Sequence, residues 1–103
     1  MTRTLVAAIL ALSALEALAV ERCRALDGYT LQCGRERVRV EGISAPAISE
    51  PGGADAQQRL QRRIERGEVV IERRGKDKYG RTLGRVYVSG NRISQSDVSG
   101  KRR

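Results

Sequence analysis

The sequence KDKYGRTLGRVYV, residues 76–88, places a basic loop directly before a strand. Its first six residues hold three cations, a tyrosine and a glycine, which favour an exposed turn. The residues that follow are rich in β-branched and aromatic side chains, which is typical of a strand. A rigid strand that presents such a loop suits a phosphate-bearing ligand, because the planar guanidinium of arginine matches phosphate oxygens. A solvated hairpin loop explains the same residues equally well.

The rest of the chain adds four strands and one helix in a definite order. Strands are expected over residues 23–26, 30–33, 36–43 and 68–73. A helix is expected over residues 54–66, where apolar residues recur every four positions, with Gly67 ending it. Three strands, a helix and two strands predict a mainly β protein: a closed five-stranded OB-fold barrel with the helix between strands three and four. Such barrels bind oligonucleotides and oligosaccharides through strands two and three and the loops joining strands one to two and four to five.

The two ends of the chain are expected to lie outside this domain. Residues 1–19 combine a basic start, an apolar run of 11 residues at 5–15 and small residues before a cut after Ala19. They are typical of a secretory signal, with an uncleaved anchor as the alternative. The protein is therefore predicted to be periplasmic or secreted, with a monomeric domain over residues 20–93 and no membrane span in the mature chain. Residues 94–103 are predicted to form a polar basic tail, and the chain from Arg92 onward is expected to fray.

Charge and composition narrow the possible functions. The chain carries a net charge of +8 and contains no histidine. A histidine general base, a Ser-His-Asp triad and a histidine-rich zinc site are therefore excluded. A basic surface on so small a domain favours a polyanionic partner, such as nucleic acid, an acidic polysaccharide or an anionic membrane.

The two cysteines, Cys23 and Cys33, predict a disulfide in an exported chain. Counted outward from a turn centred on Gly28, they fall opposite each other across a hairpin. Two reduced, buried thiols are the alternative.

Three motifs resemble the staphylococcal nuclease (thermonuclease) family: DGYT at 27–30, RVRVEGISAP at 37–46 and DKYGRTL at 77–83. The resemblance runs from about residue 23 to residue 93. It implies an OB barrel and calcium-dependent cleavage of DNA and RNA phosphodiesters. It also implies a site with two aspartates on calcium, a glutamate as general base and two arginines on the reacting phosphate.

Only part of this site is present in the chain. The two arginines match Arg39 and Arg81, whereas the calcium aspartates are replaced by Tyr29 and Ser44 and the glutamate by Ala47. Calcium needs several oxygen ligands, usually including carboxylates, so the resemblance predicts a lost calcium site and no cofactor. Without the metal and the base, water is not activated for attack, and the chain is expected to be inactive.

Three hypotheses for the function remain. In the first, a degenerate nuclease domain binds nucleic acid or another polyanion, with Arg39, Arg81, Lys76 and Lys78 on phosphates and Tyr29 and Tyr79 stacking on bases. Tyr29 could instead simply cover the core.

In the second hypothesis, the protein is a phosphodiesterase with a rebuilt metal site that uses the nearby carboxylates, namely Asp27, Glu41, Glu50 and Asp77. In the third, the protein binds an acidic exopolysaccharide in the cell envelope.

Overall fold

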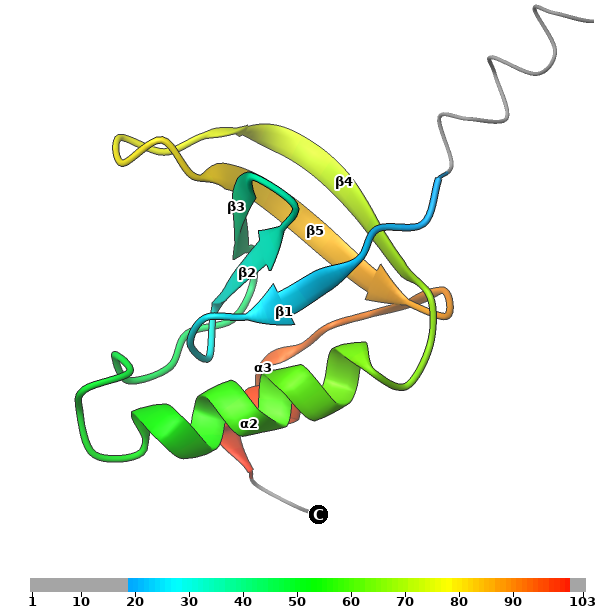
Figure 1. Ribbon diagram of the computed structural model, residues 1–103. Coiled ribbons are helices and arrows are strands. Elements are labelled where there is room, and N and C mark those ends of the chain that lie inside the picture. The colour runs from blue at the N-terminus through cyan, green and yellow to red at the C-terminus, as the bar shows by residue number, and fades with distance from the viewer. Residues whose placement is uncertain (1–18, 101–103) are drawn as a thin grey trace, which may run out of the picture.

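The computed structural model describes residues 19–100, in which a curled sheet packs against one long helix (Figure 1). The elements are β1 (Cys23–Ala25), β2 (Thr30–Cys33), β3 (Glu36–Val40), α2 (Gly53–Ile64), β4 (Val69–Lys76), β5 (Thr82–Val88), β6 (Asn91–Arg92) and α3 (Gln95–Ser99). The strands follow the order β1-β2-β3-β5-β4, and β6 pairs with β5. Only β3 and β5 pair in parallel. The mainly β, OB-like fold with its main helix between β3 and β4 is as predicted.

The predicted barrel is not fully closed. Between β1 and β4 the described chain forms only the isolated bridge Glu21–Val69, in which the Glu21 amide donates to the Val69 carbonyl over 2.8 Å. Because β1 has only three residues, it is too short to form a complete ladder with β4. The prediction of a closed barrel is therefore wrong in this detail.

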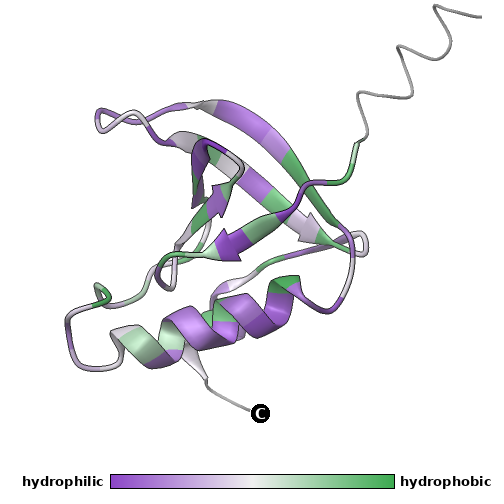
Figure 2. Cartoon of the chain, viewed as in Figure 1, coloured by the Kyte–Doolittle hydropathy of each residue, from purple (hydrophilic) through white to green (hydrophobic). Residues whose placement is uncertain are grey.

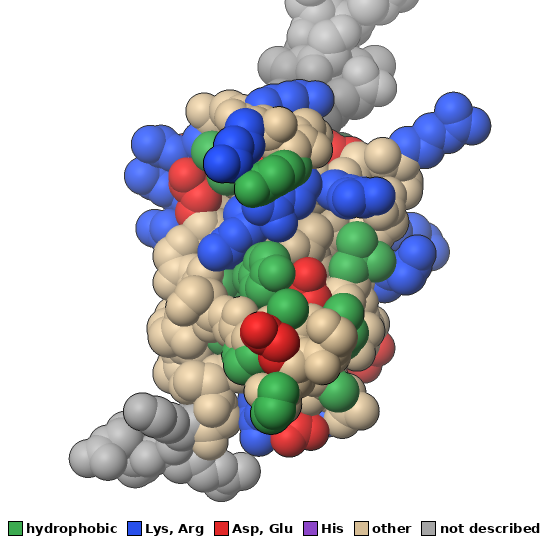
Figure 3. Space-filling view, turned by 90° about the vertical axis from the view of Figure 1, so that its left-hand side faces the viewer, with side chains coloured by type: hydrophobic (Ala, Val, Ile, Leu, Met, Phe, Trp, Pro, Cys, Tyr) green, Lys and Arg blue, Asp and Glu red, His purple; other side chains and the backbone are tan. Residues whose placement is uncertain are grey.

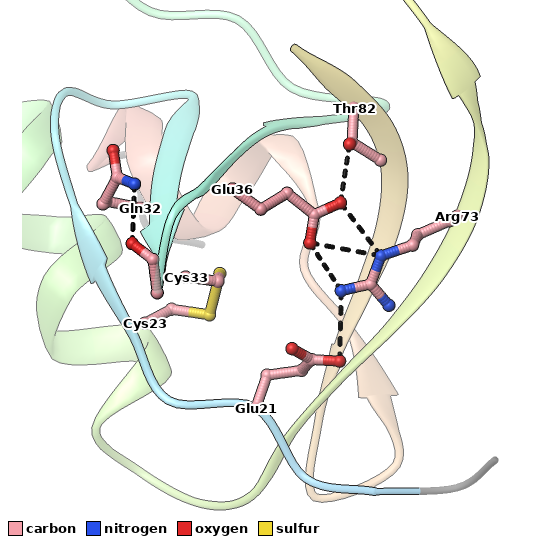
Figure 4. A network of polar contacts seen from close by, with 8 residues as sticks. Glu21, Cys23, Gln32, Cys33, Glu36, Arg73 and Thr82 are labelled. Atoms are coloured by element: carbon pink, nitrogen blue, oxygen red, sulfur yellow. Dashed lines mark hydrogen bonds and ion pairs between the residues drawn. A yellow bond between two sulfur atoms is a disulfide. The ribbon is translucent and has the colours of Figure 1, made fainter.

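A polar network spans the open seam (Figure 4). Nη2 of Arg73 on β4 lies 2.7 Å from Oε1 of Glu36 on β3 and 3.2 Å from Oε2 of Glu21. Thr82 on β5 donates its hydroxyl to the other oxygen of Glu36 over 2.6 Å. The hydrogen bond from Arg73 lowers the pKa of Glu36 to about 2, and the bond from Thr82 adds to this. Side chains thus connect three strands and the segment before β1 where backbone pairing ends.

The network predicts an acid-sensitive contribution to stability. Because the pKa of Glu36 in the folded state lies below its usual 4.5, its contribution is present above pH 4.5 and is lost as the pH falls towards 2. Glu36→Gln is expected to lower the free energy of unfolding by about 1 kcal/mol at pH 7, since solvent screens this partly exposed pair. Urea unfolding at pH 7 and pH 3 measures the change, and the variant should lose less stability than the wild type between those two values.

The control for this prediction is Glu68→Gln, which changes an exposed carboxylate outside the network. Equal effects of the two substitutions at both pH values would contradict the role assigned to Glu36.

The disulfide predicted from the hairpin is confirmed. Cys23 of β1 lies opposite Cys33 of β2 in the ladder, and the two are covalently bonded. The amide of Leu26 donates to the carbonyl of Thr30 over 2.9 Å, as expected for a turn over residues 27–29. Closing this short loop stabilises the fold by about 2–3 kcal/mol in the chain-entropy description.

Helix α2 covers the core with one face (Figure 2). Ala56, Leu60 and Ile64 are buried at spacings of four residues, as the sequence predicts. The helix begins at Gly53, where a Cβ would lie 1.9 Å from the carbonyl oxygen of Ala47, so the preceding loop leaves no room for a side chain. The largest fully buried side chains of the core are Leu31, Leu60, Ile93, Val38, Val40, Val86, Val88 and Val98.

Several predicted boundaries are corrected. The helix ends at Ile64 with Glu65 as its C-cap, and Gly67 packs against Ser89 instead of providing a left-handed cap. The strand expected over residues 36–43 stops at Val40, because the chain bends at Gly42, whose φ is 86°. The strand expected over residues 68–73 runs from Val69 to Lys76, through an irregularity between Arg73 and Gly75.

The expectation that the chain frays from Arg92 onward is wrong for the described residues up to 100. Ile93 and Val98 are 1% and 2% exposed, and α3 packs against α2. A capping box begins α3, in which the Ser94 amide donates to Oδ2 of Asp97 over 2.8 Å. Two apolar residues inside a polar segment were too weak a signal to predict this packing.

The predicted signal sequence lies almost wholly outside the described residues, which begin at Ala19. Within the part of the chain that the structure describes, no helix is long and apolar enough to cross a membrane.

Candidate nucleic-acid interface

The β1–β2 loop and the β4–β5 loop lie on the same side of the molecule, the left side of Figure 1, and the end of β3 contacts the first of them. Figure 3 looks onto this side, and Lys and Arg side chains gather in its upper part, where the β4–β5 loop lies. The amide of Val40 donates to the carbonyl of Tyr29 over 2.9 Å, which joins β3 to the first loop. Sequence reasoning predicted that these two loops form the binding surface, and the fold brings them to the same side.

Arg39 is a half-buried cation at the end of β3. Its guanidinium carbon lies 4.7 Å from the centroid of the Tyr29 ring, and Nη1 donates to the carbonyl of Val40 over 2.6 Å. Burial lowers the pKa of Arg39, and the positive charge of Arg81 lowers it further. No carboxylate of the described residues forms an ion pair with Arg39. The charges of Asp27 and Asp77 oppose this lowering, but neither carboxylate forms an ion pair with Arg39.

Tyr29 is fixed by the packing of its loop. The backbone at Gly28 lies so close to α2 that a Cβ there would be 2.6 Å from the Cβ atoms of Ala45 and Ala56. The amide of Tyr29 donates to Oδ1 of Asp27 over 2.9 Å. The ring packs against the hydrophobic core, as expected of a tyrosine that covers the core, and it also contacts Arg39; base stacking by Tyr29 stays a prediction.

Asp77 shapes the second loop and holds Arg81. Its Oδ1 accepts from the amides of Tyr79 and Arg81, each over 2.9 Å, and its Oδ2 lies 2.6 Å from Nε of Arg81. Partial burial raises the pKa of Asp77, but the hydrogen bonds from the backbone and side chain of Arg81 outweigh it, so the pKa is lowered. Asp77 therefore stays ionised and fixes the position of Arg81.

The other predicted contacts are more exposed. Tyr79 is 70% exposed, with Nζ of Lys78 5.3 Å and the guanidinium carbon of Arg81 5.5 Å from its ring centroid. Its exposure suits a base-stacking side chain. Lys76 ends β4, and its charge lowers the pKa of Glu36, which places it on the side of the seam network.

The positions that hold carboxylates in the resembled family have other partners here. The backbone amide and carbonyl of Ser44 bond to the side chain of Gln95 over 2.8 and 2.9 Å. The amide of Ala47 donates to Oε1 of Glu50 over 2.9 Å. Gln95, which sequence reasoning missed, thus ties α3 to the loop after β3; glutamine in a polar segment gave no signal for this contact.

The residues present do not fit a calcium ion. Asp27 and Asp77 accept hydrogen bonds that shape their loops, and Glu50 bonds to a backbone amide. Glu41 pairs with Arg74 at 3.3 Å and with Arg85 at 3.9 Å. Across residues 19–100, no three His, Cys, Asp or Glu side chains gather as a metal-binding group. Calcium requires six to eight oxygen ligands, so no reaction step can be assigned to a metal here.

The OB-like sheet with its main helix between β3 and β4, together with the two arginines in the matching motifs, is what the nuclease family of OB-like domains leads one to expect. A model of the family described as staphylococcal nuclease homologue matches residues 37–99. The chain belongs to this family, and the match includes α3.

Two curated relatives add detail to this membership. "Micrococcal nuclease" of Shigella flexneri is 42% identical over 71 residues, which cover 65% of this chain and 41% of the relative. "Protein ParB" of Escherichia coli is 36% identical over 73 residues, which cover 67% of this chain and 41% of the relative. The chain thus spans about two fifths of the length of the curated relatives it matches.

Proposed function

We propose that this chain binds nucleic acid through Arg39 and Arg81 and does not cut it. The observation that carries the proposal is the half-buried guanidinium of Arg39, which lies over the Tyr29 ring and forms no ion pair with a carboxylate of the described residues, together with Arg81, which Asp77 holds in the β4–β5 loop. A phosphate would supply the missing negative charge, and a planar guanidinium can hold two of its oxygens at once. Tyr79, exposed beside Arg81, offers a ring on which a base of the same strand can stack.

The proposal that the chain does not cut is supported by the side chains at the family's catalytic positions. Tyr29, Ser44 and Ala47 offer no carboxylate to a metal or to an attacking water. Each carboxylate considered for a rebuilt site is already bonded elsewhere. We include export in the proposal, because a disulfide persists in the oxidising periplasm or outside the cell.

The test is the affinity for a fluorescently labelled single-stranded oligonucleotide, measured by anisotropy at several salt concentrations. Arg39→Gln with Arg81→Gln is expected to weaken binding at least roughly 100-fold, because a hydrogen bond to a charged group contributes about 1.5–3 kcal/mol net of water and two are lost. The slope of log affinity against log salt should become shallower by about 1.4, since each single-strand phosphate contact contributes about 0.7.

The matched control is Arg24→Gln with Arg35→Gln, which removes the same charge from exposed positions on β1 and on the β2–β3 turn. Equal weakening by the two double variants, or binding that does not depend on salt, would refute the proposal. Preferential displacement of the oligonucleotide by an acidic polysaccharide of equal charge would favour the envelope hypothesis instead.

A further inference from the structure

A second basic surface lies on α2, apart from the loop end of the barrel. Arg59 and Arg66 each lie three and four residues from the adjacent pair Arg62 and Arg63, which places the four arginines along one side of the helix. The core residues lie on a neighbouring face of α2. Arg62 and Arg66 are exposed, whereas Arg59 and Arg63 are partly buried, and Arg63 donates to the carbonyl of Asn91.

Helix α3 turns this helix face into a hollow. A cavity of 380 Å³ between α2 and α3 is lined by the four arginines together with Ser96, Asp97 and Gly100. Gly100 has a φ of 75°, and a Cβ at this position would lie 2.6 Å from Cζ of Arg59. The glycine therefore lets the end of α3 lie directly against a guanidinium. Figure 1 shows α3 next to α2, and Val98 of α3 is buried in the core.

The charges of the hollow are not balanced. Its one carboxylate, Asp97, lies 3.4 Å from Nε of Arg63 and also accepts from the amide of Ser94. Arg59, Arg62 and Arg66 form no ion pair within residues 19–100. Like charges three and four positions apart each cost an isolated helix a few tenths of a kcal/mol. A bound anion would remove this repulsion.

We propose that the hollow between α2 and α3 binds a backbone phosphate of a nucleic-acid strand, as a second site separate from Arg39 and Arg81. Three guanidinium groups without carboxylate partners supply the planar donors that phosphate oxygens accept. The lining contains no apolar side chain that could enter a bilayer, which argues against a membrane surface. With one site at the loop end and another on α2, the domain engages two strands, or two segments of one long strand.

The location of binding is tested by NMR. We expect amides of residues 59–66 and 95–100 to shift on addition of a short oligothymidylate, both in the protein and in the variant with Arg39→Gln and Arg81→Gln. Shifts confined to the loops at the barrel end would overturn the inference and leave the proposed function standing. Shifts confined to α2 and α3 would support the inference and refute the proposed function.

The energetic contribution is tested with Arg59→Ala, Arg62→Ala and Arg66→Ala combined. This variant keeps Arg63 and its contact with Asp97, and alanine favours the helix. Binding of a long single strand is expected to weaken at least tenfold, and its salt slope should become shallower by about 2. The control, Arg22→Ala, Arg24→Ala and Arg35→Ala combined, removes equal charge from exposed positions elsewhere.

Equal losses in the two triple variants would overturn the second site, since overall charge would then explain the binding. A loss of binding to anionic vesicles without a loss of DNA binding would also overturn it.

Discussion

The protein is expected not to cut single-stranded DNA with calcium or with a chelator, whereas Tyr29→Asp, Ser44→Asp and Ala47→Glu combined should cut when calcium is present. Restoring the carboxylates supplies oxygen ligands to the metal and a base to the attacking water. A gain of at least roughly 100-fold over the unmodified protein is expected, because a positioned general base alone contributes about that much. Release of labelled fragments over time is the measurement.

The structure indicates why this restoration is feasible. The contacts of Ser44 and Ala47 with Gln95 and Glu50 use backbone atoms, which a substitution retains. Tyr29 is the costly position, because its ring packs against the core and contacts Arg39. Circular dichroism of the variant must therefore show that it folds.

The matched control carries Tyr29→Asn, Ser44→Asn and Ala47→Gln, which reproduces the shapes without the charges. Calcium-dependent cutting by the unmodified protein would refute the claim that the catalytic site is lost. If the variant with the three restored carboxylates folds but does not cut DNA, the claim that the scaffold and the two arginines retain catalytic geometry would be refuted. Cutting by the uncharged control would show that carboxylates are not what the protein lacks.

Leu60→Ala is expected to produce the largest loss of stability. Leu60 is 0% exposed and lies on the face of α2 that covers the barrel. Its truncation removes apolar contact and leaves a cavity, which typically costs about 2–5 kcal/mol. In a domain of this size each kcal/mol lowers the melting temperature by about 4–8 °C, so a fall of about 8–40 °C is expected. The core contains no Phe or Trp that could fill the space.

Thermal unfolding followed by circular dichroism measures this loss, with Gln58→Ala, an exposed change on the same helix, as the control. A fall of less than 5 °C for Leu60→Ala would show that α2 is not essential to the core. It would also weaken the second phosphate site, which depends on α2 being held firmly against the barrel.

The contacts at the open seam and in the C-terminal segment could not be predicted from the sequence. The pairing of Cys23 with Cys33 followed from counting residues outward from a turn, because strands in a hairpin have a fixed register. The contact of Arg73 with Glu36 joins residues 37 positions apart in the sequence, and no local sequence pattern predicts a contact between residues so far apart. The packing of Val98 and the bonds of Gln95 to Ser44 are equally remote in sequence.

The sequence by itself determined the order of β1 to β5 and α2, the hairpin disulfide, the family and the two arginines in the family's motifs. Periodicity, turn residues and short motifs are local, and each is read within a few positions. Tertiary structure alone decided that Arg39 lies against Tyr29, that the barrel stays open along one seam and that α3 folds onto α2. It also decided that four arginines on a helix line a hollow. These features arise because packing brings together residues whose separation along the chain carries no signal of their proximity in space.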